Sequence, residues 1–192
     1  MTAGQFDEAI ARVDAAHAED PEKDASGQPK ELVYARRMSA WLEKLAPGAP
    51  EALRLAVRCQ HIRRWAIRRS VYPEGAAGYR KWRADEAAAH AVVAKEILEK
   101  AGYDEPAVQK VQALVRKENL KRDPDAQLLE DVSCLVFLEN YFGEFAAKHN
   151  EPTLLRILRK TWPKMSARGQ QAALGLNLSA PLRIIVQKAL SK

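Results

Sequence analysis

Residues 127–145, QLLEDVSCLVFLENYFGEF, place apolar side chains around nearly the whole circumference of a helix. A helix on the surface of a protein shows a single apolar stripe, whereas a helix that is apolar on all sides is buried. A β-strand is the less favoured interpretation, because the pattern continues for about twenty residues without a turn signal. The stretch therefore predicts a central, buried helix over about residues 125–142.

A second stretch, from Glu51 to Arg68, contains no glycine and no proline. Two opposite faces of such a helix carry apolar residues, Leu53 and Val57 on one and Leu55, Cys59, Ile62 and Ala66 on the other. A helix that is apolar on two sides belongs in the middle of a bundle. We therefore expect a second central helix over about residues 51–68, packed against the first.

The rest of the chain shows shorter helical patterns separated by proline, glycine and polar loops. The predicted helices cover residues 5–18, 30–45, 78–101, 104–115, 152–161, 166–174 and 181–190. Pro73, Gly75 and Gly78 predict a loop over Ser70–Gly78. No β-alternation and no internal repeat is present, so the fold class is all-α, a helical bundle. The 192 residues suit one domain, with residues 150–192 as helices packed on the bundle.

Charge and cysteine content narrow the setting of the protein. The net charge of +6 and the pI near 9.4 would suit a nucleic-acid partner, but the basic residues are interpreted as dispersed among 25 acidic ones. Cys59 and Cys134 both lie in apolar helical patterns and are expected to be reduced core residues. The N-terminus lacks a signal-peptide pattern and no stretch is long enough to span a membrane. We expect a cytoplasmic protein without a membrane partner.

Four predicted helices carry a polar side chain on an apolar face. These inward residues are Glu31, His61, His90 and Asp131. Helical bundles build metal sites by projecting such side chains inward, and two histidines with carboxylates suit Zn, Mn or Fe. The alternative is that the groups satisfy one another, with Asp131 paired to Arg64 and each histidine bonded to a carbonyl. We expect the four residues to converge in one polar cavity.

Arginine and aromatic residues gather between Cys59 and His90. The candidate ligand-binding residues are Arg64, Arg68, Arg83, Lys117, Tyr79 and Trp82. Guanidinium groups beside aromatic rings can hold phosphates and stack a base, so a small anionic or phosphorylated ligand is expected. RNA is a less favoured partner for the same side chains. Alternatively, the tryptophans close one end of the bundle with arginines packed over them.

Two resemblances add to this interpretation. The pattern QHIRRW, GYRKWR, LEDVSCLVFLE and TWPKMS closely resembles a family catalogued as a domain of unknown function. More distantly, residues 31–131 are similar to the HD-domain superfamily of all-α, metal-dependent phosphohydrolases. That similarity implies metal ligands at Glu31, His61 and Asp131, with His90 comparable to an accessory ligand. The His-Asp dipeptide of that superfamily is missing here.

Two functions are consistent with these features. One is an HD-like metal-dependent phosphohydrolase acting on a small phosphorylated or nucleotide ligand, with Asp131 and Arg64 as catalytic residues. The other is a non-catalytic module that binds an anionic metabolite or RNA on a degenerate HD-like fold. The missing His-Asp pair favours the second function, and whether the chain is an enzyme stays open. The sequence does not determine the oligomeric state.

Overall fold

The structure is a computed structural model that describes residues 3–120 and 122–191. These residues form ten α-helices and three short 3-10 helices and contain no β-strand, which confirms the all-α fold class. An isolated bridge joins Lys23 to Pro29 in the loop after the first helix. None of the helices described is long and apolar enough to cross a membrane. Cys59 and Cys134 are buried free thiols, as expected.

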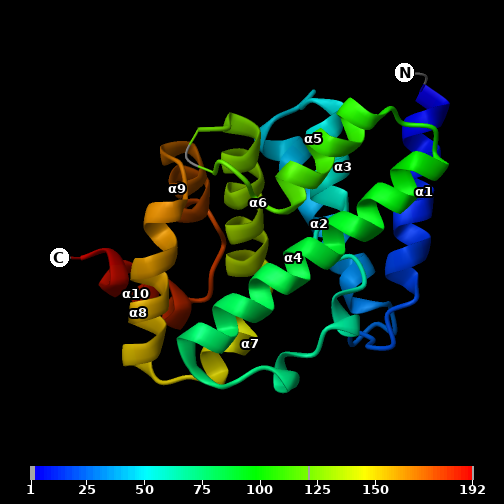
Figure 1. Cartoon of the computed structure of the whole chain (residues 1–192). Coiled ribbons are helices and arrows are strands. Elements are labelled where there is room, and N and C mark those ends of the chain that lie inside the picture. The colour runs from blue at the N-terminus through cyan, green and yellow to red at the C-terminus, as the bar shows by residue number, and fades with distance from the viewer. Residues whose placement is uncertain (1–2, 121, 192) are drawn as a thin grey trace. The chain divides into compact units, whose positions relative to one another are not determined.

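The chain divides into two compact units, Met1–Asn119 and Leu120–Lys192. Unit 1 contains α1 (Ala3–Ala18), α2 (Lys30–Leu45), α3 (Glu51–Arg58), α4 (Gly75–Lys100) and α5 (Glu105–Val115), with 3-10 helices η1 (Arg64–Ala66) and η2 (Arg69–Val71) between α3 and α4. Figure 1 draws these elements from blue to green, with α4 as the long green helix. Whether the two units form the single predicted domain stays a prediction.

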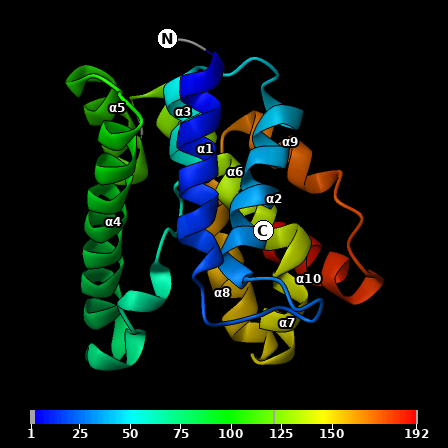
Figure 2. The ribbon, with the colours of Figure 1, turned by 90° about the vertical axis from the view of Figure 1, so that its right-hand side faces the viewer.

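In unit 1 the short helix α3 is the most enclosed element. It packs against α1, α2 and α5, while α4 lies along α5 and also contacts α1 (Figure 2). Leu53, Leu55, Ala56 and Val57 are at most 1% exposed, so both predicted faces of this helix are covered. The predicted packing of α3 against α6 would be a contact between the two units, and it stays a prediction.

The helix α3 ends at Arg58, which corrects the predicted span of 51–68. Cys59 is the C-terminal cap, and the next residues form turns in which His61 (φ 64°) and Arg63 (φ 52°) adopt the left-handed conformation. Residues other than glycine rarely adopt this backbone conformation, since it costs them roughly 1 kcal/mol or more. No glycine or proline marks this end, so the sequence pattern continued past it.

The predicted loop over residues 70–78 is shorter than expected, because α4 begins at Gly75. Gly75 has φ 85°, a conformation that glycine adopts without steric cost. Gly78 lies inside the first turn of α4, where a side chain would lie 1.9 Å from the carbonyl oxygen of Pro73. Both glycines therefore allow the helix to start close to the preceding chain instead of extending the loop.

Unit 2 contains α6 (Pro124–Asn140), α7 (Phe142–Ala147), α8 (Glu151–Thr161), α9 (Ala167–Leu174) and α10 (Ala180–Leu190), with η3 (Trp162–Lys164) after α8. The predicted helices over 125–142, 152–161, 166–174 and 181–190 are confirmed within one or two residues. Asp123, Asn150 and Ser166 each accept a hydrogen bond from a backbone amide at a helix start. The break at Tyr141 that separates α7 from α6 was not predicted.

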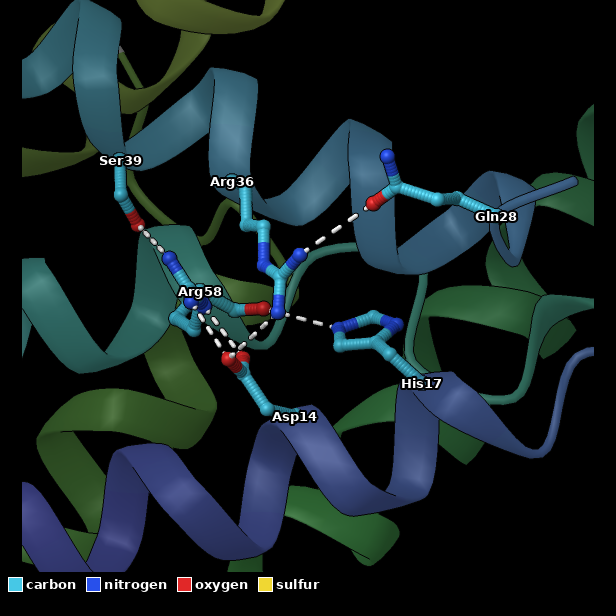
Figure 3. Close-up of polar contacts among 6 residues, drawn as sticks. All are labelled: Asp14, His17, Gln28, Arg36, Ser39 and Arg58. Carbon is cyan, nitrogen blue, oxygen red and sulfur yellow. Dashed lines mark hydrogen bonds and ion pairs between the residues drawn. The ribbon is translucent and has the colours of Figure 1, made fainter. Parts of the chain in front are cut away.

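Three helices of unit 1 are joined by one partly buried arginine. Arg58, at the end of α3, donates to both carboxylate oxygens of Asp14 on α1 at 2.7 Å and to Ser39 on α2 at 3.1 Å (Figure 3). The backbone carbonyl of Arg58 lies 3.0 Å from His17 Nε2. A bidentate pair of this kind fixes both distance and orientation. It therefore holds α1 and α2 against the end of α3, where the chain turns.

Replacing Arg58 by methionine is expected to lower the free energy of unfolding by about 2–4 kcal/mol, since the partly buried Asp14 carboxylate loses its partner. Arg12→Met is the matched control, because the Arg12–Glu8 pair on α1 is about half exposed and should contribute about 0.5 kcal/mol or less. Urea unfolding followed by circular dichroism measures both. Equal losses in the two variants would contradict the clamping role of Arg58.

Candidate functional site

The turn after α3 brings two side chains to the site. The ring of His61 stacks on Tyr34 of α2, with centroids 4.2 Å apart and planes 9° from parallel. Arg64, three residues on, places Nη1 2.8 Å from His61 Nε2 and 3.1 Å from Nδ1, and donates to the ring nitrogen that lacks a proton. Its guanidinium also lies 5.1 Å from the centre of the Trp82 ring. Arg64 is therefore held between an imidazole and an indole.

A buried carboxylate on α4 faces this arginine. Glu86 is 1% exposed, and neither of its carboxylate oxygens accepts a hydrogen bond among the described residues. Arg64 Nε and Arg83 Nη1 each lie 3.7 Å from one oxygen, too far for a hydrogen bond but close enough for attraction. Burial raises the pKa of Glu86, and the two guanidinium groups oppose that shift. Glu86 thus links two arginines without satisfying either fully.

Glu31, in the first turn of α2, approaches the same histidine from the other side. Its Oε2 lies 3.3 Å from His61 Nδ1. Burial raises the pKa of Glu31 to about 7, although Arg64 opposes this. Burial also lowers the pKa of His61 well below its usual value, and Arg64 lowers it further. His61 is therefore neutral at pH 7, and its contact with Glu31 is not an ion pair.

His90 completes the cluster from the middle of α4. Its ring centre lies 6.0 Å from that of His61. Burial lowers the pKa of His90 to about 3, and Arg64 and Arg83 contribute to the shift. Its Nε2 atom is buried and has no hydrogen-bond partner among the described residues. An unprotonated nitrogen of a neutral imidazole can accept a hydrogen bond from a ligand or bind a metal ion.

Two cavities flank the cluster and share Glu86. The larger has a volume of about 540 Å³ and is lined by Asp20, Pro21, Glu22, Lys30, Glu31, Arg64, Trp65, Ile67, Arg68, Arg69, Ser70, Trp82 and Glu86. The smaller, about 200 Å³, is lined by Gln60, His61, Arg83, Ala84, Glu86, Ala87, His90, Val115, Arg116 and Lys117. Its volume is too small for a nucleotide, whereas the larger cavity is in the range of small-molecule sites.

Four cations and four carboxylates line the larger cavity. Lys30 pairs with Glu22 at 2.9 Å, and Arg69 donates to the carbonyls of Tyr72 and Pro73. Asp20 accepts from the backbone amides of Glu22 and Glu31. Arg68 is exposed and makes no hydrogen bond or ion pair in the part of the chain that the structure describes. Arg68 is therefore the cation at this cavity with the most donors left for a ligand.

Residues 7–186 match the family described as "Domain of unknown function (DUF4202)". The chain belongs to the DUF4202 family. No curated protein and no solved structure matches it. The match covers the segments that carry the resemblance noted in the sequence, whereas no link to the HD-domain superfamily is found.

Most of the predicted site residues of this DUF4202 chain lie around the two cavities. Glu31, Arg64, Arg68 and Trp82 line the larger cavity, and His61, His90, Arg83 and Lys117 line the smaller one. Tyr79 is 52% exposed and its ring lies 5.7 Å from that of Trp82. Trp65 and Arg69, which belong to the predicted group of arginine and aromatic residues between Cys59 and His90, also line the larger cavity. Lys30 was missed, although it is the sequence neighbour of Glu31.

Asp131 lies on α6 in unit 2, where other groups satisfy it. Its carboxylate accepts hydrogen bonds from the backbone amide and the hydroxyl of Ser166 and from Gln127 Nε2. Gly169 passes so close that a side chain there would lie 2.6 Å from the Asp131 carboxyl carbon. These bonds anchor the start of α9 to α6 and compensate for burial of the carboxylate. The predicted convergence of Asp131 with the histidines would be a contact between the two units, and it stays a prediction.

The donor set near His61 has the chemistry of a divalent metal site but not the geometry of one. Glu31, His61, Glu86 and His90 offer oxygen and nitrogen ligands, and several of these atoms have no partner. However, no group of three or more His, Cys, Asp or Glu side chains within residues 3–120 and 122–191 is arranged to hold a metal ion. Arg64 lies against both ring nitrogens of His61 and repels a cation there.

Glu31→Gln is expected to stabilise the protein increasingly as the pH rises. The pKa of Glu31 rises from 4.5 to about 7 on folding, so the unfolded chain binds fewer protons between these values and the free energy of unfolding falls with pH. Glutamine lacks this effect, so the stability of the variant relative to wild type should increase by roughly 1–3 kcal/mol between pH 4.5 and 7.5.

Urea unfolding at several pH values measures the effect of Glu31→Gln. Glu43→Gln, at an exposed position on the same helix, is the matched control and should show a pH-independent difference from wild type. Burial lowers the pKa of His17, His61 and His90, and their opposing contribution is present in all three proteins. A Glu31→Gln difference that stayed constant across this range would mean that Glu31 is ionised throughout.

Proposed function

We propose that unit 1 is a binding module for a small phosphorylated ligand of about nucleotide size. The observation that carries the proposal is the larger cavity, where Lys30, Arg64, Arg68 and Arg69 surround a space of about 540 Å³ beside Trp65 and Trp82. Arginine binds phosphate through two parallel hydrogen bonds, and indole rings offer flat apolar surfaces to a base. The cavity thus combines the two recognition elements that a nucleotide requires.

The distribution of free donors and acceptors supports an orientation for the ligand. Arg68 lies at the exposed side and has no protein partner among the described residues, so it suits the phosphate. Glu31 and Glu86 lie at the buried side with oxygens that accept no hydrogen bond there. Unpaired buried acceptors favour a ligand that brings N–H donors, such as the amino group of a base. The phosphate end would then remain near solvent.

The position of Arg64 favours binding over metal-assisted hydrolysis. Its guanidinium lies within 3.1 Å of both ring nitrogens of His61 and 3.7 Å from Glu86. A metal ion bound by His61 would have to approach within about 2 Å of one of these nitrogens, next to a fixed positive charge. Ligand binding in the orientation above requires no such rearrangement, because Arg64 can keep its contacts with His61 and Glu86 while Arg68 binds the phosphate.

Arg68→Met is expected to weaken binding of a nucleoside monophosphate by about 10- to 100-fold, the usual effect of losing a charged hydrogen bond. Isothermal calorimetry with adenosine and inosine monophosphates, and with inorganic phosphate, measures the affinity. Arg12→Met, an exposed arginine on α1 outside the cavity, is the matched control and should bind like wild type. Unchanged affinity in Arg68→Met, or equal loss in both variants, would reject this cavity as the site.

A second candidate is an HD-like phosphohydrolase with a divalent Zn, Mn or Fe ion. The unpartnered buried atoms Glu31 Oε2 and His90 Nε2 favour it, since such atoms suit an ion that neutralises them. In this candidate Glu31, His61, His90 and Asp131 would hold the metal, Arg83 and Lys117 would bind phosphate, and Asp131 and Arg64 would act in catalysis. RNA binding on the exposed ring of Tyr79, next to the buried Trp82, is a variant of the module proposal.

Metal content separates the two candidates. Purified without chelator or affinity tag, the chain is expected to contain far less than one equivalent of Zn, Mn or Fe, as measured by plasma mass spectrometry. The melting temperature of the wild type should also respond no more to these ions than that of His90→Asn. One equivalent of metal in the wild type and none in His90→Asn would instead favour the hydrolase, because only a ligand substitution removes a specifically bound ion.

A further inference from the structure

The C-terminal part of the chain is strongly and exclusively basic. Residues 152–192 contain eight lysine and arginine residues and no aspartate or glutamate. Spread evenly, the 25 acidic residues of the chain would place about five in a segment of this length. The acidic residues are therefore not interspersed with the basic ones here, which corrects the interpretation of the whole charge pattern as dispersed. The seven described cations of the segment are all exposed.

Three of these cations are fixed by contacts within unit 2. Arg159 on α8 donates to the carbonyls of Lys188 and Ala189 at the end of α10, where it satisfies the helix C-terminus. Lys188 pairs with Glu151 at 2.9 Å, and Arg183 donates to the carbonyl of Leu178. The contacts of Arg159 and Lys188 join α8 and α10, which lie side by side, whereas that of Arg183 ties α10 to the loop before it. These three cations therefore have a structural role within unit 2.

The other four cations have no such role. Arg156, Lys160, Lys164 and Arg168 make no hydrogen bond or ion pair through their side chains in the described part of the chain. Arg156 and Lys160 are one helical turn apart on α8, and with Arg159 they line a surface groove of about 440 Å³. Lys164 and Arg168 follow on η3 and in the first turn of α9. Unneutralised cations in this number repel one another, so an anionic partner would stabilise them.

We infer that this surface, formed by Arg156, Lys160, Lys164 and Arg168, binds the phosphate backbone of a nucleic acid. A polyanion places several charges along one extended molecule, which a single small anion does not. Backbone contacts require lysine and arginine without a shaped pocket. The open groove on α8 presents Arg156 and Lys160, and the one acidic residue in its lining, Glu151, is paired with Lys188. The inference concerns unit 2 alone and does not depend on the cavity proposed as a ligand site in unit 1.

The surroundings of these cations favour nucleic acid over a membrane surface. A helix that lies on a membrane inserts an exposed apolar face into the lipid. On α8 Leu154 and Leu158 are buried, and the apolar residues that line the groove beside the cations are Pro152 and the half-buried Leu155. Two such residues do not form the continuous apolar face that a helix inserts into a membrane.

Fluorescence anisotropy with a labelled 20-nucleotide RNA, and with DNA of the same sequence, tests the inference. Replacing Arg156, Lys160, Lys164 and Arg168 together by glutamine should weaken binding at least 10-fold at 100 mM salt. The slope of log affinity against log salt should become shallower by about three, since each phosphate contact on a single strand contributes about 0.7. The matched control replaces Arg12, Lys44, Lys95 and Lys100 of unit 1 by glutamine, which removes the same charge.

Each result decides the question. Weaker binding and a shallower slope in the unit 2 variant, with both values close to wild type in the control, would support the inference. If RNA and DNA respond alike, the backbone is recognised, and if only RNA responds, the ribose also contributes. Equal losses in both variants would mean non-specific attraction by net charge and would overturn the surface assignment. Absence of nucleic-acid binding, with sedimentation on anionic phospholipid vesicles instead, would replace it by a membrane surface.

Discussion

The organisation of unit 1 depends on one contact, in which the guanidinium group of Arg64 lies beside the neutral ring of His61. Arg64 lies between His61 and Trp82, and a cation in this position needs a carboxylate nearby. Glu86, in the middle of α4, supplies this carboxylate, and its Oε1 lies 3.7 Å from Arg64 Nε. Burial lowers the pKa of His61 well below its usual value, and the same arginine lowers it further. One side chain thus connects the turn after α3 with α4 and adds to the effect of burial on His61.

The sequence predicted the helix α3 that positions the site but not where it ends. Patterns of apolar residues located α5 and α9 within about one residue. The end of α3 has no marker in the sequence, because the left-handed residues His61 and Arg63 are not glycines. Their strain is compensated by tertiary contacts, chiefly the stacking of His61 on Tyr34, which a helical pattern does not contain.

The same limit explains which parts of the site could be predicted. A polar residue on an apolar face must be satisfied, and Glu31 and His90 both lie beside His61, although they line two cavities and not the single one expected. This reasoning did not identify the partner of each group. Asp131 was expected to need a cation, a metal or a set of hydrogen bonds, and the hydroxyl and amide of Ser166 supply hydrogen bonds. Burial determines that a partner exists, whereas only the packing determines which one.

Residues 1–151 and residues 152–192 differ in how their charges are distributed. Residues 1–151 contain 23 basic and 25 acidic residues, so the whole positive net charge of the protein comes from residues 152–192. In unit 1 cations and carboxylates alternate around a cavity, and their near balance favours a ligand that carries both an anionic group and N–H donors. On α8 no acidic residue follows Glu151, so the cations there attract phosphates wherever a backbone presents them. The pI near 9.4 describes neither region, because it combines the balanced charges of residues 1–151 with the purely basic charges of residues 152–192.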